Sequence, residues 1–111
     1  MCAQPVLKHA PHIDTLELLK DIERKVLWLS AQIIHHANNE RINVDGLKVG
    51  GHQASSASLV TIMTALYFSV LNPEDRVAVK PHASPVFHAI QYLFRNQTLD
   101  KLKAFRSLGG A

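Results

Sequence analysis

The stretch DTLELLKDIERKVLWLSAQII, residues 14–34, predicts a long amphipathic helix around which a core can form. Its apolar side chains recur at alternating intervals of three and four residues, which places them along one face. They are Leu19, Ile22, Val26, Leu29 and Ile33, and Leu27 and Trp28 widen the stripe. Asp14, with Glu17 three residues later, forms an acidic capping box, so the helix should begin at Asp14. It should end near Asn38 and Asn39.

A second helix is predicted over residues 54–71, after a linking stretch that carries three glycines. Asn72 and Pro73 should end this helix, because proline disfavours the α conformation in the residue before it. The expected core positions are Leu59, Ile62, Met63, Leu66 and Val70. We expect them to pack against the stripe of the first helix.

The rest of the chain predicts one strand and two further helices. Residues 76–80 are a short β-branched run, the only predicted strand. A third helix is expected over residues 85–95, with Ser84 as N-cap and Pro85 in its first turn, and Thr98 should cap a short fourth helix. The inward residues expected are Val86, Ala89, Ile90, Leu93, Phe94, Leu99, Leu102 and Phe105. The predicted fold class is therefore α/β, mostly helical, with about four helices and one short strand whose partners come from elsewhere.

Length and composition indicate one compact unit: 111 residues, 47% apolar, with a net charge of +3. Residues 1–13 read as an extended leader and residues 14–111 as the folded unit. Scattered lysines and arginines argue against nucleic-acid binding, and the longest apolar stretch, residues 59–71, is too short and too polar to span a membrane. Cys2 is the single cysteine, which excludes an internal disulfide and a cysteine zinc site. Without a secretory signal pattern, we expect a cytoplasmic protein.

Seven histidines are the one compositional oddity, and their spacing argues against a metal site. The pairs nearest in sequence are His9 and His12, His35 and His36, and His82 and His88. His9 and His12 lie in the leader, where no helix holds them. The side chains of His35 and His36 would point about 100° apart on a helix, and those of His82 and His88 would point in different directions. No HExxH pattern occurs. We therefore predict no intrinsic metal site, and we interpret His35, His36 and His88 as ordinary helix residues, partly exposed or hydrogen-bonded.

Two histidines differ, because turn chemistry places each at the start of a helix. His52 follows Gly50-Gly51 and precedes a serine-rich turn, and His82 follows the predicted strand and precedes Ser84-Pro85. Helix starts offer free amides to an anion such as phosphate, and an imidazole beside them exchanges protons near neutral pH. The pattern favours a phosphate-bearing ligand, with two purely structural histidines as the alternative.

Three motifs together resemble the amino-terminal part of the transketolase family. They are Gly50-Gly51-His52-Gln53-Ala54-Ser55, Val79-Lys80-Pro81-His82-Ala83-Ser84-Pro85 and Leu102-Lys103-Ala104-Phe105-Arg106. They look most like the homodimeric pyruvate dehydrogenase decarboxylating component, and the resemblance covers roughly residues 16–111.

The resemblance implies an enzyme that uses thiamine diphosphate and Mg²⁺. It also implies the reaction, in which the carbon–carbon bond next to a carbonyl group is cleaved and the carbonyl fragment is transferred. The substrate would be a 2-keto acid or a sugar phosphate. By position in the motifs, His52 and His82 match the catalytic histidines that bind substrate oxygens. Ser55 and Lys80 fall near the diphosphate. The resemblance also implies a homodimer, with the cofactor between two subunits.

The sequence departs from the family pattern at three points. Pro81 stands where glycine is common, Lys80 stands where glutamine is common, and no Gly-Asp-Gly metal motif occurs. Together with Gly109-Gly110 after the last helix, this predicts a fragment of a larger catalytic chain that is inactive alone. The alternative is a small helical interaction module, with the stripe of the first helix and residues 77–79 as its contact surfaces.

Overall fold

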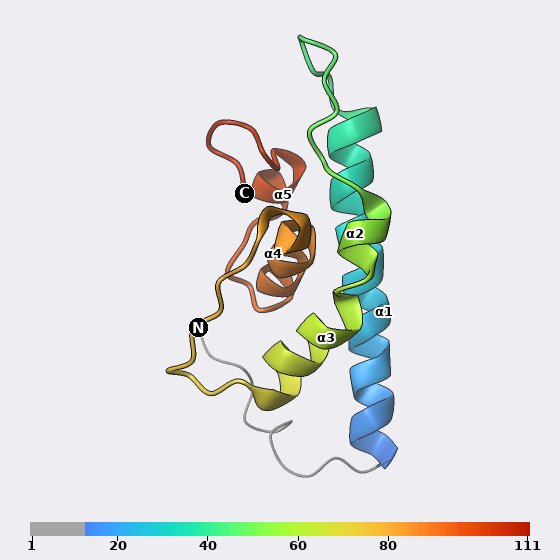
Figure 1. The fold of residues 1–111 in the computed structure, drawn as a ribbon, viewed down its shortest axis with the longest axis vertical. Coiled ribbons are helices and arrows are strands. Elements are labelled where there is room, and N and C mark those ends of the chain that lie inside the picture. Colours follow the sequence, from blue (N-terminus) through green and yellow to red (C-terminus); the bar gives the residue numbers. More distant parts are fainter. Residues whose placement is uncertain (1–12) are drawn as a thin grey trace.

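The computed structural model describes residues 13–111, and these are mostly helical (Figure 1). Helix α1 (Ile13–His35) is the longest element, and the other helices lie along one side of it. In chain order the elements that follow are η2 (His36–Glu40), α2 (Gln53–Ala57), α3 (Val60–Ala65), η3 (Leu66–Val70), η4 (Pro81–Ala83), α4 (Ser84–Leu93) and α5 (Leu99–Lys103). Of the expected leader, residues 1–12 lie outside the described part, and Ile13 already belongs to α1.

The predicted α/β class is wrong, because residues 13–111 contain no strand. Residues 76–80 form neither a helix nor a strand and belong to the connection between η3 and η4, in which Lys80 is extended, with φ −79° and ψ 158°. A β-branched run becomes a strand only when a neighbouring strand takes up its backbone hydrogen bonds. Among the described residues the neighbours of this segment are helices, so it has no strand to pair with and the described fold is all-helical.

The apolar stripe of α1 faces the core as predicted, although it is narrower. Val26 and Ile33 are 0% and 5% exposed, and the other stripe residues pack against them. The widening residues Leu27 and Trp28 are exposed, since they lie about 100° and 200° around the helix from Val26 and no element covers them. Asp14 lies inside the first turn rather than capping it, because α1 begins at Ile13.

The second predicted helix is broken into three parts. A turn at Ser58 and Leu59 separates α2 from α3, and there the hydroxyl of Ser58 donates to the carbonyl of Ser55 at 2.9 Å. Serine side chains compete with the backbone in this way, which favours a turn over a continuous helix. The break turns α3 relative to α2, so Ile62 and Val70 are exposed while Met63 is buried. The predicted end of this helix before Asn72 is confirmed, because Leu71 is extended.

The C-terminal helices close the core. Ser84 lies within α4 and donates to the carbonyl of Pro81 at 2.7 Å, so its predicted role as N-cap is wrong. Thr98 caps α5 as predicted, accepting from the Lys101 nitrogen at 3.2 Å. Of the expected inward residues Leu99 is exposed, while Leu93 and Phe94 are partly buried and pack against the core. The fully buried ones are Val86, Ala89, Ile90, Leu102 and Phe105.

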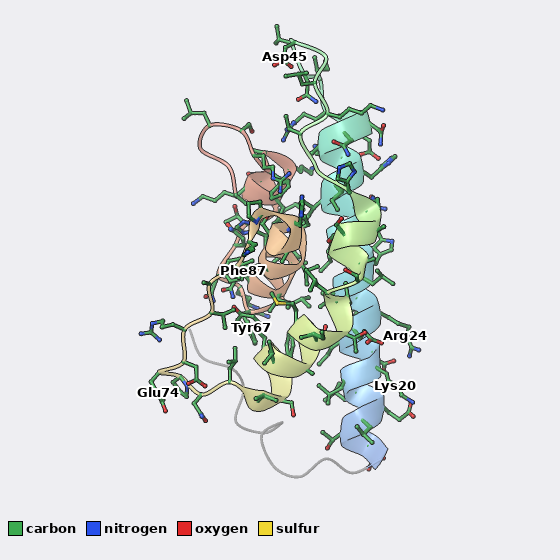
Figure 2. The ribbon with its side chains drawn as sticks, in the orientation of Figure 1. Lys20, Arg24, Asp45, Tyr67, Glu74 and Phe87 are labelled. Atoms are coloured by element: carbon green, nitrogen blue, oxygen red, sulfur yellow. The ribbon has the colours of Figure 1, made fainter. Side chains whose placement is uncertain are left out.

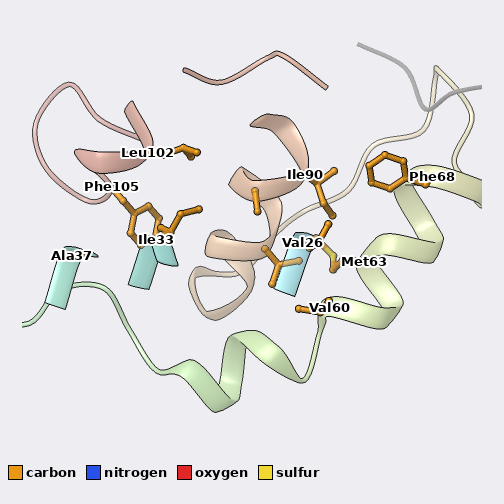
Figure 3. Packing of buried hydrophobic residues seen from close by; sticks show 11 residues of the cluster. Val26, Ile33, Ala37, Val60, Met63, Phe68, Ile90, Leu102 and Phe105 are labelled. Atoms are coloured by element: carbon orange, nitrogen blue, oxygen red, sulfur yellow. The ribbon is translucent and has the colours of Figure 1, made fainter. Parts of the chain in front are cut away.

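One core joins α1, η2, α3, η3, α4 and α5 (Figure 3). Ile90 of α4 lies opposite Val26 of α1, with Met63 of α3 beside them. Tyr67 and Phe87 meet edge to face at 6.1 Å where η3 approaches α4, whereas Lys20 and Arg24 project from the far side of α1 (Figure 2). None of the helices in residues 13–111 has both the length and the apolar character needed to cross a membrane.

Candidate functional site

The fold brings together the two histidines singled out from the sequence. The rings of His52 and His82 lie edge to face, with centroids 6.5 Å apart and an angle of 64° between their planes. Both residues are exposed. His52 is extended just before α2, and His82 lies in η4, so two separate turns present one imidazole each to solvent.

The turn before His52 is held by the end of α1 and η2. The side-chain oxygen of Asn38 accepts from the Gly50 nitrogen at 2.7 Å, and its amide donates to the Gly51 carbonyl at 3.2 Å. A β-carbon on Gly50 would lie 2.6 Å from the carbonyl oxygen of Ile34, and Gly51 has φ +90°. Only glycine tolerates such an approach or such a φ without strain, so the glycine pair sets the entry to His52.

Arg106, which follows α5, bridges the two histidine turns. Its Nη1 donates to the carbonyl of Val49 at 2.9 Å, and its Nη2 donates to the carbonyl of Pro81 at 2.7 Å. Nη2 also lies 3.3 Å from the Ser84 hydroxyl. One guanidinium thereby contacts the chain ahead of both imidazoles.

The two residues predicted near a diphosphate flank the histidine pair in sequence. Ser55 lies one turn beyond His52 in α2, half-buried, and its carbonyl accepts from Ser58. Lys80 is exposed directly before η4, and its carbonyl accepts from the Ala83 nitrogen at 2.9 Å. Neighbouring Ser56 is 2% exposed, and its hydroxyl is buried with no hydrogen-bond partner.

The two expected helix starts differ in the structure. The helix after His52 is short, because α2 spans only 5 residues. The helix expected after His82 is present as α4, which spans 10 residues and follows η4. Because the field of a helix end grows with the number of aligned peptide units, the start of α2 is not a strong anion site on its own.

His88 lies behind the pair, half-buried in α4. Its ring meets Phe87 and Phe105 edge to face at 5.3 and 5.8 Å, and Gln97 Nε2 lies 3.0 Å from its Nδ1. Burial lowers the pKa of His88, and the positive charge of Arg106 lowers it further. The neutral ring, with Nδ1 accepting from Gln97, is the form that this site stabilises.

The remaining described histidines, His35 and His36, are hydrogen-bonded helix residues, as predicted. His35 Nε2 and His36 Nδ1 each lie 3.2 Å from an oxygen of Glu40, and Asn39 reaches His35 Nδ1 at 3.1 Å. Nowhere in residues 13–111 do three or more His, Cys, Asp or Glu side chains gather in a way that would hold a metal ion.

Sequence reasoning missed the roles of Arg106 and Asn38. Arg106 was part of a recognised motif, but its contacts reach 57 and 25 residues back along the chain, where no local pattern points. Asn38 was expected only to mark the fading end of a helix. Comparison with protein-family models, curated proteins and solved structures finds no match, so the resemblance to transketolases remains a prediction from the motifs.

Proposed function

We propose that this chain carries the substrate-binding histidines of a thiamine diphosphate-dependent enzyme of the transketolase and pyruvate dehydrogenase type. The observation that supports the proposal is the pairing of His52 and His82 at 6.5 Å on an exposed face. The two motifs that suggested the family lie about thirty residues apart in sequence. The fold therefore brings together two residues that the resemblance assigns to one substrate site.

The paired imidazoles suit a 2-keto substrate. A neutral imidazole offers one donor and one acceptor, and its protonated form offers two donors, so the pair can bind the carbonyl oxygen and a neighbouring carboxylate or hydroxyl together. Imidazole also takes and returns a proton near neutral pH, as charge develops on such an oxygen. The bound cofactor supplies the electron sink for carbon–carbon cleavage.

The described residues fit only one side of such a site. No acidic cluster in residues 13–111 can hold Mg²⁺, and Ser55 and Lys80 are the only diphosphate contacts that the resemblance assigns here. The metal and most of the cofactor would have to be bound by residues other than these, in a homodimer. We therefore propose no activity for the chain by itself.

A chimaera tests the proposal directly. Residues 14–111 replace the corresponding segment of a homodimeric pyruvate dehydrogenase decarboxylating component, and decarboxylation of pyruvate is measured. The chimaera should be active, and His52→Gln or His82→Gln within it should lower kcat/KM by about 100-fold or more. His35→Gln is the matched control and should leave activity unchanged, because the ring nitrogens of His35 lie against Glu40 and Asn39. A folded, cofactor-loaded chimaera with full activity in both paired-histidine variants would contradict the proposal.

Calorimetry on the isolated chain tests the proposal that residues other than these bind the metal and most of the cofactor. Titration with thiamine diphosphate and Mg²⁺ should give no heat of tight binding, because the metal ligands are not among the described residues. Tight, Mg²⁺-dependent binding to the isolated chain would show that residues elsewhere are not required.

A helical interaction module is the second candidate, and the exposed Trp28 favours it. The stripe of α1 cannot be its contact surface, as first expected, since the other helices cover it. Trp28 is instead 63% exposed between two apolar grooves that share Trp28 and Leu29. Three basic residues, Arg24, Lys25 and Lys103, and one acidic residue, Glu40, border the grooves. Such a surface suits an amphipathic helix with acidic flanks.

The single tryptophan makes this candidate easy to test. A synthetic amphipathic helix with glutamates beside its apolar face should shift the Trp28 emission to the blue. The same peptide with lysines should not, and Lys25→Glu should weaken the response to the acidic peptide. Identical responses to both peptides, or none to either, would remove this candidate.

A further inference from the structure

We propose that Arg106 is the positioning residue for the His52–His82 pair. The inference rests on the proposed function only for what the pair binds, since the geometry that Arg106 maintains is measurable without any substrate. Val49 lies three residues before His52, and Pro81 directly precedes His82. A side chain that binds the carbonyls of both residues controls how far apart the two imidazoles stand.

The two main contacts use different nitrogens of one guanidinium. Nη1 donates to Val49 at 2.9 Å, and Nη2 donates to Pro81 at 2.7 Å. The guanidinium is planar and rigid, so the two carbonyls are held at a separation that the group itself defines. Each bond is charge-assisted and therefore stronger than a bond between neutral groups. The ammonium of lysine has three donors but only one nitrogen, so it cannot hold the two carbonyls at the separation that Nη1 and Nη2 define.

The guanidinium is fixed independently of the histidines. Arg106 has φ +58°, and its backbone nitrogen donates to the Ala111 carbonyl at 2.9 Å. Its Cζ lies 4.8 Å from the centre of the Phe105 ring, and Phe105 is 1% exposed. On the other side, a β-carbon at Gly51 would lie only 3.1 Å from Nη1. The buried Phe105 and the open side of Gly51 thus define where the guanidinium sits.

The two histidine turns are aligned by packing as well as by Arg106. α2 contacts both η4 and α4, and the rings of His52 and His82 meet edge to face. Each turn has its own local anchor, Asn38 for the first and the Ser84–Pro81 hydrogen bond for the second. Without Arg106, each turn should stay folded and packed, while the separation of the two imidazoles is no longer set by a shared side chain.

Proton NMR of the histidine rings in the isolated chain tests the inference. In the wild-type chain, ring protons of His52 and His82 should show a cross-relaxation peak. In both Arg106→Ala and Arg106→Lys this peak should become clearly weaker, and both sets of ring signals should move toward the values of a free histidine. The Phe68–Phe94 contact, whose rings stack at 4.8 Å in the core, serves as the internal record that each variant is folded.

Arg41→Lys is the matched control. Arg41 also ties the α5 region to another part of the chain, but a single nitrogen, Nη1, reaches both Lys103 O at 3.2 Å and Phe105 O at 2.7 Å. Lysine can replace Nη1 and loses only the 3.3 Å bond from Nε to the Asn43 side chain, so this variant should keep the His52–His82 peak. Should Arg106→Ala fail to fold, Arg106→Lys retains the charge and stem and decides the question.

Two results would overturn the inference. One is an unchanged His52–His82 peak in a folded Arg106→Lys chain. The other is an equal loss of the peak in Arg41→Lys, because the cause would then be a general loosening of α5. The NMR outcome is separate from that of the chimaera. Loss of the peak together with an inactive chimaera would uphold the positioning role of Arg106 and reject the proposed function. An unchanged peak with an active chimaera would do the reverse.

Discussion

The side-chain oxygen of Asn38 accepts a hydrogen bond from the backbone nitrogen of Gly50 at 2.7 Å. The same carboxamide donates to the carbonyl of Gly51 at 3.2 Å, so one side chain binds both glycines from η2. Gly50 is buried, and its N–H would otherwise have no access to water. The orientation of His52 therefore depends on how the first long helix ends.

Replacing Asn38 should destabilise the chain. Asn38→Ala removes both bonds and leaves the Gly50 nitrogen buried without a partner, so the free energy of unfolding should fall by about 1–3 kcal/mol. Asn38→Asp keeps the oxygen that accepts from the Gly50 nitrogen, so its loss of stability should be smaller. This holds although the variant places an anionic oxygen near the Gly51 carbonyl. Chemical denaturation measures both effects. Asn39→Ala, at an exposed neighbour, is the control, and an equal loss there would show that the glycine clamp is not responsible.

Gly50→Ala should be far more damaging than Gly46→Ala. A β-carbon at Gly50 meets the backbone oxygen of Ile34 at 2.6 Å, which cannot move without disturbing α1, so we expect a loss of about 2–3 kcal/mol. Gly46 has φ +72° but nothing within 4 Å, so only backbone strain of about 1 kcal/mol should apply. Thermal unfolding compares the two variants. Equal unfolding temperatures would mean that the turn yields to the added methyl group.

The lowered pKa of His88 makes stability depend on pH. Because the folded protein binds this proton less readily than the unfolded chain does, stability is full above the unfolded pKa of about 6.5. It should then fall as the pH drops from there toward the lower, folded pKa. Denaturation midpoints between about pH 7.5 and pH 5 measure the effect.

His88→Gln isolates this contribution. The variant cannot take up the proton, so its midpoint should change less over the same pH range, although it is less stable at neutral pH because the ring contacts with Phe87 and Phe105 are lost. His35→Gln, which removes an exposed histidine, should keep the wild-type pH dependence. If His88→Gln retained the full dependence, another group would have to cause it.

Truncation of Ile90 should reduce the stability of the chain far more than truncation of Ile62. Both were expected in the core, but Ile90 is 0% exposed and Ile62 is 60% exposed. Ile90→Ala should cost about 2–5 kcal/mol, since it leaves a cavity among packed helices, whereas Ile62→Ala should change stability by about 0.5 kcal/mol or less. Urea denaturation of the pair checks the packing of α3, and a large loss for Ile62→Ala would show that its outer face is covered.

Local patterns in the sequence were sufficient for several elements. The spacing from Leu19 to Ile33 predicted α1 and its buried face, and Thr98 marked the start of α5. The motifs also singled out His52 and His82. The helix and cap predictions are confirmed because helix periodicity and caps depend on residues within a few positions of one another.

Tertiary structure decided whether each local preference was realised. Residues 76–80 have the composition of a strand, but the fold gives them no strand to pair with. Ile62 has core spacing, but the break at Ser58 turns it outward. The clamp of Arg106 on Val49 and Pro81 exists only because α5 returns to the two histidine turns. Sequence alone thus determined which segments are helical and which histidines stand at turns, while long-range packing determined that those histidines meet, because contacts across tens of residues leave no periodic trace in the chain.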